Sequence, residues 1–437
     1  MTSKTFDAHL KTQIARYDDA LNRTGFDAAV IYSGRAAGVF LDDTTYPFIV
    51  NPLFKAWLPV TDAPDSFVVY ASGQRPQLIY CQPIDYWHAV PKDPDGFWTH
   101  GFEIHIVRSV DEARALMPGG RVAFLGDAPA DVAAWGYDEV NPAPLLNALH
   151  FARAWKTPYE LECLVEATRI GVAGHLAARD AFTAGASEYE IHIAYCAATR
   201  LTEDTLPYNN IIALNEHTAV LHYTHHDLHK PKDARSFLID AGGSFHGYAS
   251  DITRTYAREK NAFRSLIEAV DVVQQGLCRA LAPAVDYVQL HERATRELAG
   301  VLADADIITV SADNAVGSGL ATRFFPHGLG HYLGLQVHDV GGFMRDGEDS
   351  HVAPPDDYPT LRLTRKVETS QVMTVEPGVY FIPQLLEPIR DQPLGRGVNW
   401  ALVEEFYPFG GIRIEDNVTI TEDGSRNLTR EAFDAAA

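Results

Sequence analysis

The sequence predicts an α/β protein, with a mixed α/β N-terminal domain over residues 1–156 and a larger second domain over residues 157–437. Three observations support this fold class. In the first part of the chain, short runs rich in β-branched and aromatic residues alternate with helical patterns. At Lys156–Glu160 a new helix starts, because Thr157 can cap it and Pro158 suits its first turn. Beyond this point, longer helices alternate with strand-like runs.

The elements follow in order along the chain. A helical pattern covers residues 5–24, and Gly25 can end that helix. Strand-like runs bounded by turn residues lie at 27–32, 66–72, 76–81 and 121–127. In the second domain, the predicted helices are 159–184, 187–202, 261–282 and 286–305, and the predicted strands are 235–242, 248–256, 371–378 and 411–420. Two stretches rich in Pro, Asp and Gly, 341–361 and 383–399, are predicted to be long loops.

Composition and charge exclude several classes of protein. With 46% hydrophobic residues among 437, extensive disorder is excluded. A formal net charge of −22 repels nucleic acids and anionic membranes, so we expect neither as a partner. We find no signal-peptide pattern and no apolar run long enough to span a bilayer. The four cysteines lie far apart without a C-x-x-C pair, so we expect a cytoplasmic protein without disulfides.

Four carboxylates lie within apolar, strand-like runs of the second domain. Asp240 is in FLIDAGG, Asp251 in YASDITRT, Glu376 in VMTVEPG and Glu415 in GIRIEDN. Burying a lone carboxylate costs several kcal/mol, so each of these acids needs a partner or a metal. If the four acids converge, paired divalent cations are the simplest way to keep them ionised.

Histidines in the glycine-rich run 324–342 complete this pattern. The run contains His327, His331 and His338, and His331 is the natural nitrogen ligand because its surroundings are apolar. The other two histidines can donate hydrogen bonds to substrate or to a developing oxyanion. A single Asp or His in such a run is more often structural, so the metal hypothesis rests on the five residues together.

These motifs resemble the pita-bread metallopeptidases, a group that contains methionine aminopeptidase, aminopeptidase P and prolidase. The resemblance rests on D-A-G-x5-G-Y-x-x-D-I-T-R-T (240–255), H-G-L-G-H (327–331), T-V-E-P-G (374–378) and G-I-R-I-E-D (411–416). Including LNEHTAVLHYTHH (214–226), the pattern is most similar to bacterial prolidases of the organophosphorus acid anhydrolase type. The resemblance implies a creatinase-like N-terminal domain followed by a pita-bread catalytic domain.

The resemblance also implies roles for the five ligands. Asp240 would bind one metal ion, His331 and Glu376 would bind the other, and Asp251 and Glu415 would bridge the two. The expected cofactors are two Mn²⁺ per subunit, with Co²⁺ or Zn²⁺ as alternatives. The ions would share a hydroxide as nucleophile, and Glu376 would carry a proton to the leaving nitrogen.

Further catalytic candidates are His222, His338 and Arg413. His222 and His338 match substrate-side histidines of the family, whereas His225, His226 and His229 fit a polar loop. Arg413 alternates with Glu415 along a predicted strand, which places both side chains on one face. Arg413 is therefore either a catalytic group or one half of a structural ion pair with a ligand carboxylate.

The resemblance assigns a second group of residues to substrate binding. Arg362, fourteen residues before Glu376, would pair with the C-terminal carboxylate of proline, with Arg365 and Lys366 as alternatives. The other candidates are His327, Tyr208 and Val337 around the substrate, and Asp43 or Trp87 from the N-terminal domain of a second subunit. The expected assembly is accordingly a homodimer.

Together these features predict a dipeptidase that cleaves Xaa-Pro dipeptides, with adventitious hydrolysis of organophosphates as an implied side activity. The alternative within the same family is aminopeptidase P, which acts on longer peptides. A metal-free binding module is a third interpretation, but such proteins lack several of the five ligands that this chain retains.

Overall fold

In a computed structural model, which describes residues 3–437, the chain divides into two units. The first contains the chain up to Cys163 together with His246–Tyr248 and Asp346–Ser350, and the second contains the other described residues. The division between Cys163 and Leu164 falls within helix α6 (Pro158–Thr183). The boundary predicted from sequence, before residue 157, lies at the start of this helix.

A six-stranded mixed sheet forms the centre of the first unit, with the strand order β4-β3-β2-β1-β5-β6. The strands are β1 (Ala28–Tyr32), β2 (Phe67–Ala71), β3 (Gln77–Cys81), β4 (Glu103–Val107), β5 (Val122–Leu125) and β6 (Glu139–Val140). Strand β1 runs antiparallel to β2 and parallel to β5. The four predicted strands are confirmed. Strands β4 and β6 were not predicted, because both are largely exposed and carry charged residues.

Helix α1 (Ser3–Thr24) confirms the predicted first helix. It ends where expected, because Gly25 adopts a positive φ of 72° and its N–H donates to the carbonyl of Leu21. The remaining helices of the unit are α2 (Pro52–Lys55), η1 (Thr99–Gly101), α3 (Val110–Arg114), α4 (Ala130–Ala133) and α5 (Ala143–Ala152).

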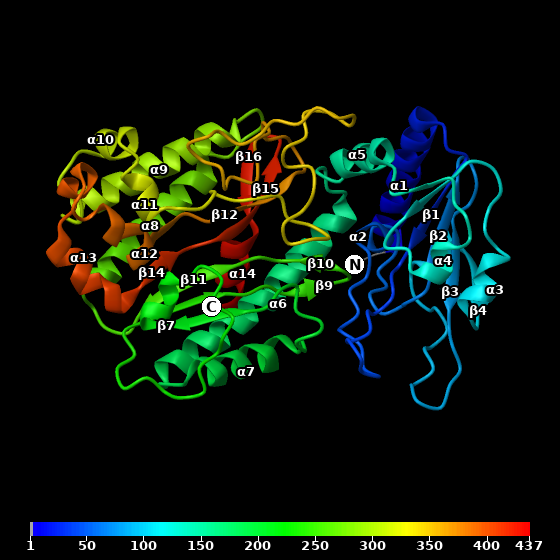
Figure 1. Ribbon diagram of the computed structural model, residues 1–437, viewed down its shortest axis with the longest axis horizontal. Helices are drawn as coiled ribbons and strands as arrows, with labels where there is room; N and C mark the ends of the chain where they lie inside the picture. The colour runs from blue at the N-terminus through cyan, green and yellow to red at the C-terminus, as the bar shows by residue number, and fades with distance from the viewer. Residues whose placement is uncertain (1–2) are drawn as a thin grey trace. The chain divides into compact units, whose positions relative to one another are not determined.

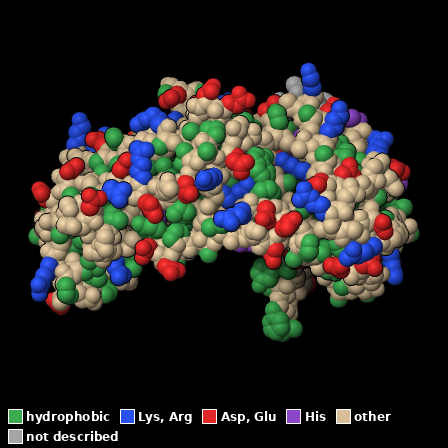
Figure 2. All heavy atoms as spheres, turned by 90° about the horizontal axis from the view of Figure 1, so that it is seen from above, with side chains coloured by type: hydrophobic (Ala, Val, Ile, Leu, Met, Phe, Trp, Pro, Cys, Tyr) green, Lys and Arg blue, Asp and Glu red, His purple; other side chains and the backbone are tan. Residues whose placement is uncertain are grey.

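Two long loops of the first unit expose large apolar side chains. Phe40 and Leu41 in one loop and Tyr86 and Trp87 in the other are each more than three-quarters exposed. Figure 1 shows both segments as blue and light-blue loops that extend away from the sheet. Acidic and basic side chains are interspersed over the face drawn in Figure 2.

The second unit is built from small sheets instead of one continuous sheet. Two have three strands, in the orders β11-β8-β7 and β12-β15-β16, and one pairs β13 with β14. The strands of this region are β7 (Ile211–Leu214), β8 (Ser236–Asp240), β9 (Ser244–Phe245), β10 (Tyr248–Ala249), β11 (Thr253–Ala257), β12 (Val372–Val375), β13 (Gly378–Tyr380), β14 (Gly411–Arg413), β15 (Asp416–Thr421) and β16 (Gly424–Asn427).

The four predicted long helices of this part are confirmed as α6, α7 (Glu188–Thr199), α8 (Ala262–Ala280) and α9 (Tyr287–Asp304). Helix α8 buries Phe263, Leu266, Val270 and Leu277 at helical spacing and contacts strands of both three-stranded sheets. Helix α7 contacts β7, and Figure 1 shows α8 and α9 on one side of the strands and α7 on the other. Within residues 3–437, no helix has the length and apolar character of a membrane span.

Two predictions for the second domain need correction. The strands predicted at 248–256, 371–378 and 411–420 are each interrupted, at residues 250–252, 376–377 and 414–415. The segment 383–399 contains short helices, which Pro383 and Pro393 help to start, whereas 341–361 contains no helix or strand, as predicted. The short helical elements are η2 (Asn215–Ala219), α10 (Ala312–Gly317), α11 (Ala321–Phe324), α12 (Pro383–Leu386), η3 (Glu387–Ile389), η4 (Pro393–Gly397), α13 (Trp400–Phe406), η5 (Tyr407–Phe409) and α14 (Leu428–Ala436).

A buried ionic network joins the C-terminal helix to the strands of the second unit. The Asp416 carboxylate is fully buried and accepts from Arg254 Nη2 at 2.6 Å and from Arg430 Nε of α14 at 2.8 Å. Arg254 also donates to the backbone carbonyls of Thr253 and Glu415. Burial opposes ionisation, but the two arginines lower the pKa of Asp416 to about 2.

We predict that Asp416→Asn lowers the free energy of unfolding of the metal-free protein by about 3–5 kcal/mol, because Arg254 then remains as a buried charge without its carboxylate. Because the pKa of Asp416 is depressed, its contribution in the wild type is present above about pH 4 and is lost as the pH falls towards 2. Urea unfolding of both proteins in chelator at pH 7 measures the difference. A difference below about 1 kcal/mol would contradict this account.

Candidate metal centre

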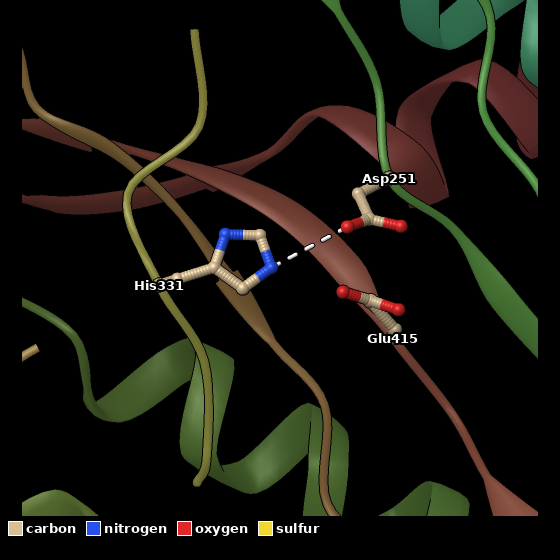
Figure 3. A group of neighbouring side chains, drawn as sticks. All are labelled: Asp251, His331 and Glu415. Atoms are coloured by element: carbon tan, nitrogen blue, oxygen red, sulfur yellow. Dashed lines mark ion pairs between the residues drawn. The ribbon is translucent and has the colours of Figure 1, made fainter. Parts of the chain in front are cut away.

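Three of the predicted ligands lie together in the interior of the second unit. One ligand atom from each of Asp251, His331 and Glu415 lies within 4.8 Å of the other two. All three residues are at most 5% exposed. Figure 3 shows the His331 imidazole pointing to the Asp251 carboxylate, with the Glu415 carboxylate beside it.

Three of the four predicted acids lie where strand pairing is interrupted, and the fourth, Asp240, ends a paired strand. Asp251 precedes β11, Glu376 separates β12 from β13, and Glu415 separates β14 from β15. Asp240 is the last residue of β8, and its register partner across the sheet is Thr253. Interruptions of this kind turn side chains out of the regular alternation of a strand, so acids from different sheets can face one point.

Backbone contacts orient His331. Its Nδ1 lies 2.9 Å from the Tyr332 carbonyl oxygen and donates to it, so Nε2 is the nitrogen that faces the predicted acids. Nε2 lies 3.3 Å from Asp251 Oδ2 and 3.6 Å from Glu376 Oε1. The preceding Gly330 allows this close approach, because a Cβ there would clash with the Thr374 carbonyl and the Tyr287 hydroxyl.

The other two predicted ligands border this group. Glu376 approaches it through His331, and Asp240 approaches it through Tyr208, whose hydroxyl lies within hydrogen-bond distance of both Asp240 and Asp251. Arg413 Nη2 lies 2.7 Å from Asp240 Oδ2. The sequence left two roles open for Arg413, and the structure contains one of them, the ion pair with a predicted ligand carboxylate.

The electrostatics of the site reflect an excess of buried acid. Burial raises the pKa of Glu376 to about 7, and burial together with Asp251 and Glu376 raises the pKa of Glu415 well above its usual range. Burial also raises the pKa of Asp240. Asp251 differs, because its interaction with His331 outweighs burial and lowers its pKa.

These residues fit a pair of divalent cations. Four carboxylates face one histidine and one arginine, so the metal-free group is short of positive charge. Oε1 of Glu415 is buried and accepts no hydrogen bond, while Oε2 accepts from the Thr253 hydroxyl at 2.7 Å. A divalent cation would satisfy this buried, unpartnered carboxylate oxygen.

His327 and His338 lie next to the ligands. The rings of His338 and His331 are 4.4 Å apart between centroids, and His327 Nδ1 lies 3.7 Å from Glu376 Oε2. Burial lowers the pKa of His338 to about 4 and that of His327 to about 3, so both imidazoles are neutral at pH 7. The Gly328 carbonyl sets the tautomer of His327, because it can only accept and lies 2.8 Å from Nδ1, while Nε2 accepts from the Tyr380 hydroxyl at 2.8 Å.

The structure leaves the other predicted residues outside this hydrogen-bonded group. His222 and Arg362 are exposed, and Val337 is half-buried next to His338. Asp43 is exposed in the first unit. Their roles stay predictions.

Three residues near the ligands were not identified from the sequence. The Thr253 hydroxyl joins Glu415 to Arg413 Nε, the Thr374 hydroxyl accepts from the His331 N–H, and Tyr380 joins His327 to Arg413. Thr253 and Thr374 each stand two residues from a predicted acid. The period-2 alternation of strands would have placed them on the same side as that acid.

Comparisons with known proteins cover both parts of the chain. Residues 4–151 match the family described as Xaa-Pro dipeptidase, N-terminal domain, and residues 162–422 match metallopeptidase family M24. The chain is 49% identical over 437 residues to the Xaa-Pro dipeptidase of Xanthomonas axonopodis pv. citri, with 99% of each chain covered. It is also 49% identical over 434 residues to the Xaa-Pro dipeptidase of Stenotrophomonas maltophilia strain K279a, with 99% of this chain and 98% of the relative covered.

Solved structures are similar over nearly the whole chain. Aminopeptidase P from Escherichia coli with the inhibitor Pro-Leu has a TM-score of 0.74 at 22% identity, covering 99% of this chain and 96% of the other. Proline aminopeptidase P II from Yersinia pestis has a TM-score of 0.73 at 22% identity, covering 99% and 97%. At this identity the likeness concerns the fold, and it confirms the predicted fold class.

We predict that the raised pKa of Glu376 makes the metal-free protein less stable as the pH rises. Because the folded state holds the proton more tightly, stability falls between pH 4.5 and about 7, by about 3 kcal/mol from this residue alone. The measurement is urea unfolding in chelator across this range. The free energy difference between wild type and Glu376→Gln should change with pH, whereas the exposed control Glu422→Gln should run parallel to wild type. If the free energies of unfolding of wild type and Glu376→Gln changed with pH in parallel, the prediction would be wrong.

Proposed function

Because the chain belongs to metallopeptidase family M24, we propose that it is a metal-dependent dipeptidase that releases proline from Xaa-Pro dipeptides. One observation carries the proposal. The group formed by Asp251, His331 and Glu415 lies in a chain that is 49% identical, along its whole length, to proteins named Xaa-Pro dipeptidase. The N-terminal match to an Xaa-Pro dipeptidase domain supports the same substrate class.

The residues that would hold two metal ions are Asp240, Asp251, His331, Glu376 and Glu415. Carboxylates with a single imidazole suit Mn²⁺, with Co²⁺ or Zn²⁺ as alternatives. When bound, the pair of ions supplies a hydroxide nucleophile at neutral pH by lowering the pKa of a water. The ions also balance the charge of acids that the protein leaves without enough cationic partners.

Glu376 is suited to carry a proton during peptide cleavage. Its Oε1 lies 3.6 Å from His331 Nε2 and its Oε2 lies 3.7 Å from His327 Nδ1, so the carboxylate borders both a predicted ligand and a second histidine. It can therefore accept a proton from the attacking water and deliver it to the proline nitrogen, which leaves only when protonated. His327, 3.7 Å away, lies where it can contact the same substrate groups.

His222, His338 and Arg413 complete the proposed catalytic residues. A neutral His338 donates a hydrogen bond to the oxygen of the scissile carbonyl without adding a charge near the metal ions. Arg413 holds the Asp240 carboxylate in place through their 2.7 Å ion pair and orients Tyr380 through a 2.8 Å hydrogen bond. His222 approaches the substrate from the segment that follows β7.

Arg362 is the proposed recognition group for the free C-terminus of the dipeptide. It is exposed, and its backbone carbonyl lies next to Gly342, four residues after His338. Bidentate pairing with the proline carboxylate would restrict the enzyme to dipeptides. Tyr208 and Val337 would bound the pocket, and Asp43 of a second subunit would close it in a homodimer. A cytoplasmic location and adventitious organophosphate hydrolysis stay predictions.

We predict that protein stripped with chelator releases no proline from Leu-Pro and that added Mn²⁺ restores the release. The reason is that the acid-rich site has no nucleophile of its own at neutral pH. Glu415→Gln, which keeps the shape of the side chain but removes a ligand charge, should stay inactive with Mn²⁺. Proline is measured directly, and circular dichroism checks that each protein is folded. Absence of release from folded, Mn²⁺-loaded wild type would overturn the proposed activity.

Arg362→Ala should raise the KM for Leu-Pro by about 10- to 100-fold, because a charge-assisted hydrogen bond to the proline carboxylate is lost. The same variant should leave the KM for Leu-Pro amide, which has no carboxylate, unchanged. Lys366→Ala is the matched control, since this exposed cation lies four residues further along the chain. A larger effect of Lys366→Ala, or faster cleavage of Leu-Pro-Gly than of Leu-Pro by wild type, would contradict the assigned role.

A further inference from the structure

The histidine-rich segment after β7 is attached to the first turn of helix α7. This segment, residues 215–229, contains five histidines. Helix α7 begins at Glu188 after the cap residue Ser187, whose hydroxyl accepts from the Glu190 N–H. The contacts between the helix and the segment centre on one side chain, Glu188, which is only 1% exposed.

The Glu188 carboxylate accepts four hydrogen bonds from four separate points along the chain. Oε1 accepts from the Leu214 N–H and from His217 Nδ1, each at 2.8 Å. Oε2 accepts from the Tyr223 hydroxyl at 2.7 Å and from the Asp227 N–H at 2.8 Å. Glu188 thus contacts the end of β7, helix η2 and both sides of the turn that carries His222.

Additional contacts support the same attachment. The Tyr189 N–H, which has no partner within the first turn of the helix, donates to the Asp227 carbonyl at 3.1 Å. The rings of His217 and Tyr223 stack with their centroids 4.5 Å apart. His226 donates from Nε2 to the Asn210 carbonyl at 2.9 Å. The segment is therefore held at residues on either side of His222.

The charge of Glu188 is stable in this buried position. Burial raises the pKa of a carboxyl group, but the hydrogen bonds from His217, Asp227, Leu214 and Tyr223 outweigh burial and lower the pKa of Glu188. The positive end of the α7 dipole acts in the same direction. An ionised carboxylate with four donors is well satisfied, and it has no remaining capacity for a metal ion or a ligand.

The anchored segment faces the candidate metal centre. The Thr218 hydroxyl of η2 accepts from the Gly411 N–H at 2.7 Å, and Gly411 begins β14, the strand that carries Arg413, the partner of Asp240. His222 is itself exposed and follows directly on the apolar residues Val220 and Leu221. The placement of His222 next to the site therefore depends on how its flanking residues are held.

We propose that Glu188 is a positioning residue that holds the segment from Leu214 to Asp227 so that His222 faces the substrate. The role of His222 rests on the proposed function, whereas the attachment itself does not. Glu188 touches neither the metal ligands nor the substrate in this account. Its effect on the reaction passes through the hydrogen bonds to Tyr223, His217 and the two backbone amides.

Glu188→Gln tests the attachment with little change in shape. Each carboxylate oxygen accepts from a backbone N–H that cannot turn away, so the NH₂ group of glutamine meets a donor in either orientation. Tyr223→Phe removes a single hydrogen bond and is the milder variant, which should fold even if Glu188→Gln does not. Glu190→Gln is the matched control, because it preserves the capping box of α7 and lies two residues away.

Amide hydrogen exchange measured by mass spectrometry shows how firmly the segment is held, independently of enzymatic activity. In Glu188→Gln and Tyr223→Phe, exchange should become faster over residues 215–227 and stay unchanged in β8 and β11. Glu190→Gln should match wild type throughout. Unchanged exchange over 215–227 in both variants would overturn the proposal, whether or not the protein cleaves Leu-Pro.

Kinetics then test whether the attachment acts through His222. In Mn²⁺-loaded enzyme, kcat/KM for Leu-Pro should fall about tenfold in Glu188→Gln and about three- to tenfold in Tyr223→Phe, with unchanged Mn²⁺ affinity. In a His222→Ala background, Tyr223→Phe should cause no further loss. The positioning role would be overturned if the effects of His222→Ala and Tyr223→Phe on kcat/KM were fully additive. A loss of Mn²⁺ affinity together with kcat/KM would overturn it as well. An inactive wild type with faster exchange in the variants would instead reject the proposed function and retain the attachment.

Discussion

Mutual repulsion among buried carboxylates is the constraint on which the rest of the second unit depends. Asp240, Asp251, Glu376 and Glu415 converge with Arg413 and His331 as their cationic partners. Burial raises the pKa of Glu376 and Glu415, and the charge of Asp251 raises both further. A protein that keeps such a group must either protonate it or bind cations there, and at neutral pH divalent metal ions are the effective solution. Metal binding and stability of this unit are therefore coupled.

Holding these acids together requires support from distant parts of the chain. The Thr253 hydroxyl fixes one oxygen of Glu415 and leaves the other unpartnered, while Asp416 beside it joins Arg254 and the C-terminal helix α14. Arg254 in turn holds the backbone on both sides of the site. The supporting residues thus decide which atoms of the ligands remain available, as outer-shell partners do in metal sites generally.

The substrate side of the site is organised by a different set of interactions. His327 donates to the Gly328 carbonyl and accepts from Tyr380, and the segment that carries His222 is attached through Glu188 at the start of α7. The Glu188 attachment does not involve the predicted ligands, whereas Tyr380 also accepts from Arg413, the partner of Asp240. The predicted ligands and the segment that carries His222 can therefore be perturbed separately, which is why metal affinity and KM are informative when measured together.

Much of the candidate site was predictable from the sequence, because the relevant signals are local. Short motifs such as D-I-T-R-T and H-G-L-G-H carry the acids and the histidine, and their order indicates the family, which the comparisons confirm. Long helices such as α8 were predictable as well, since apolar periodicity and capping depend on residues only a few positions apart.

The tertiary structure decided what local patterns do not encode. Strand interruptions at Glu376 and Glu415 arise because segments far apart in the sequence pair there, as Thr253 does with Glu415. Tyr208 bridges two acids, and Glu188 collects four donors, only after such segments have packed together. The sequence by itself determined which chemical groups this protein possesses and in what order. Only the fold determined which of their atoms meet, because convergence depends on contacts between residues more than a hundred positions apart.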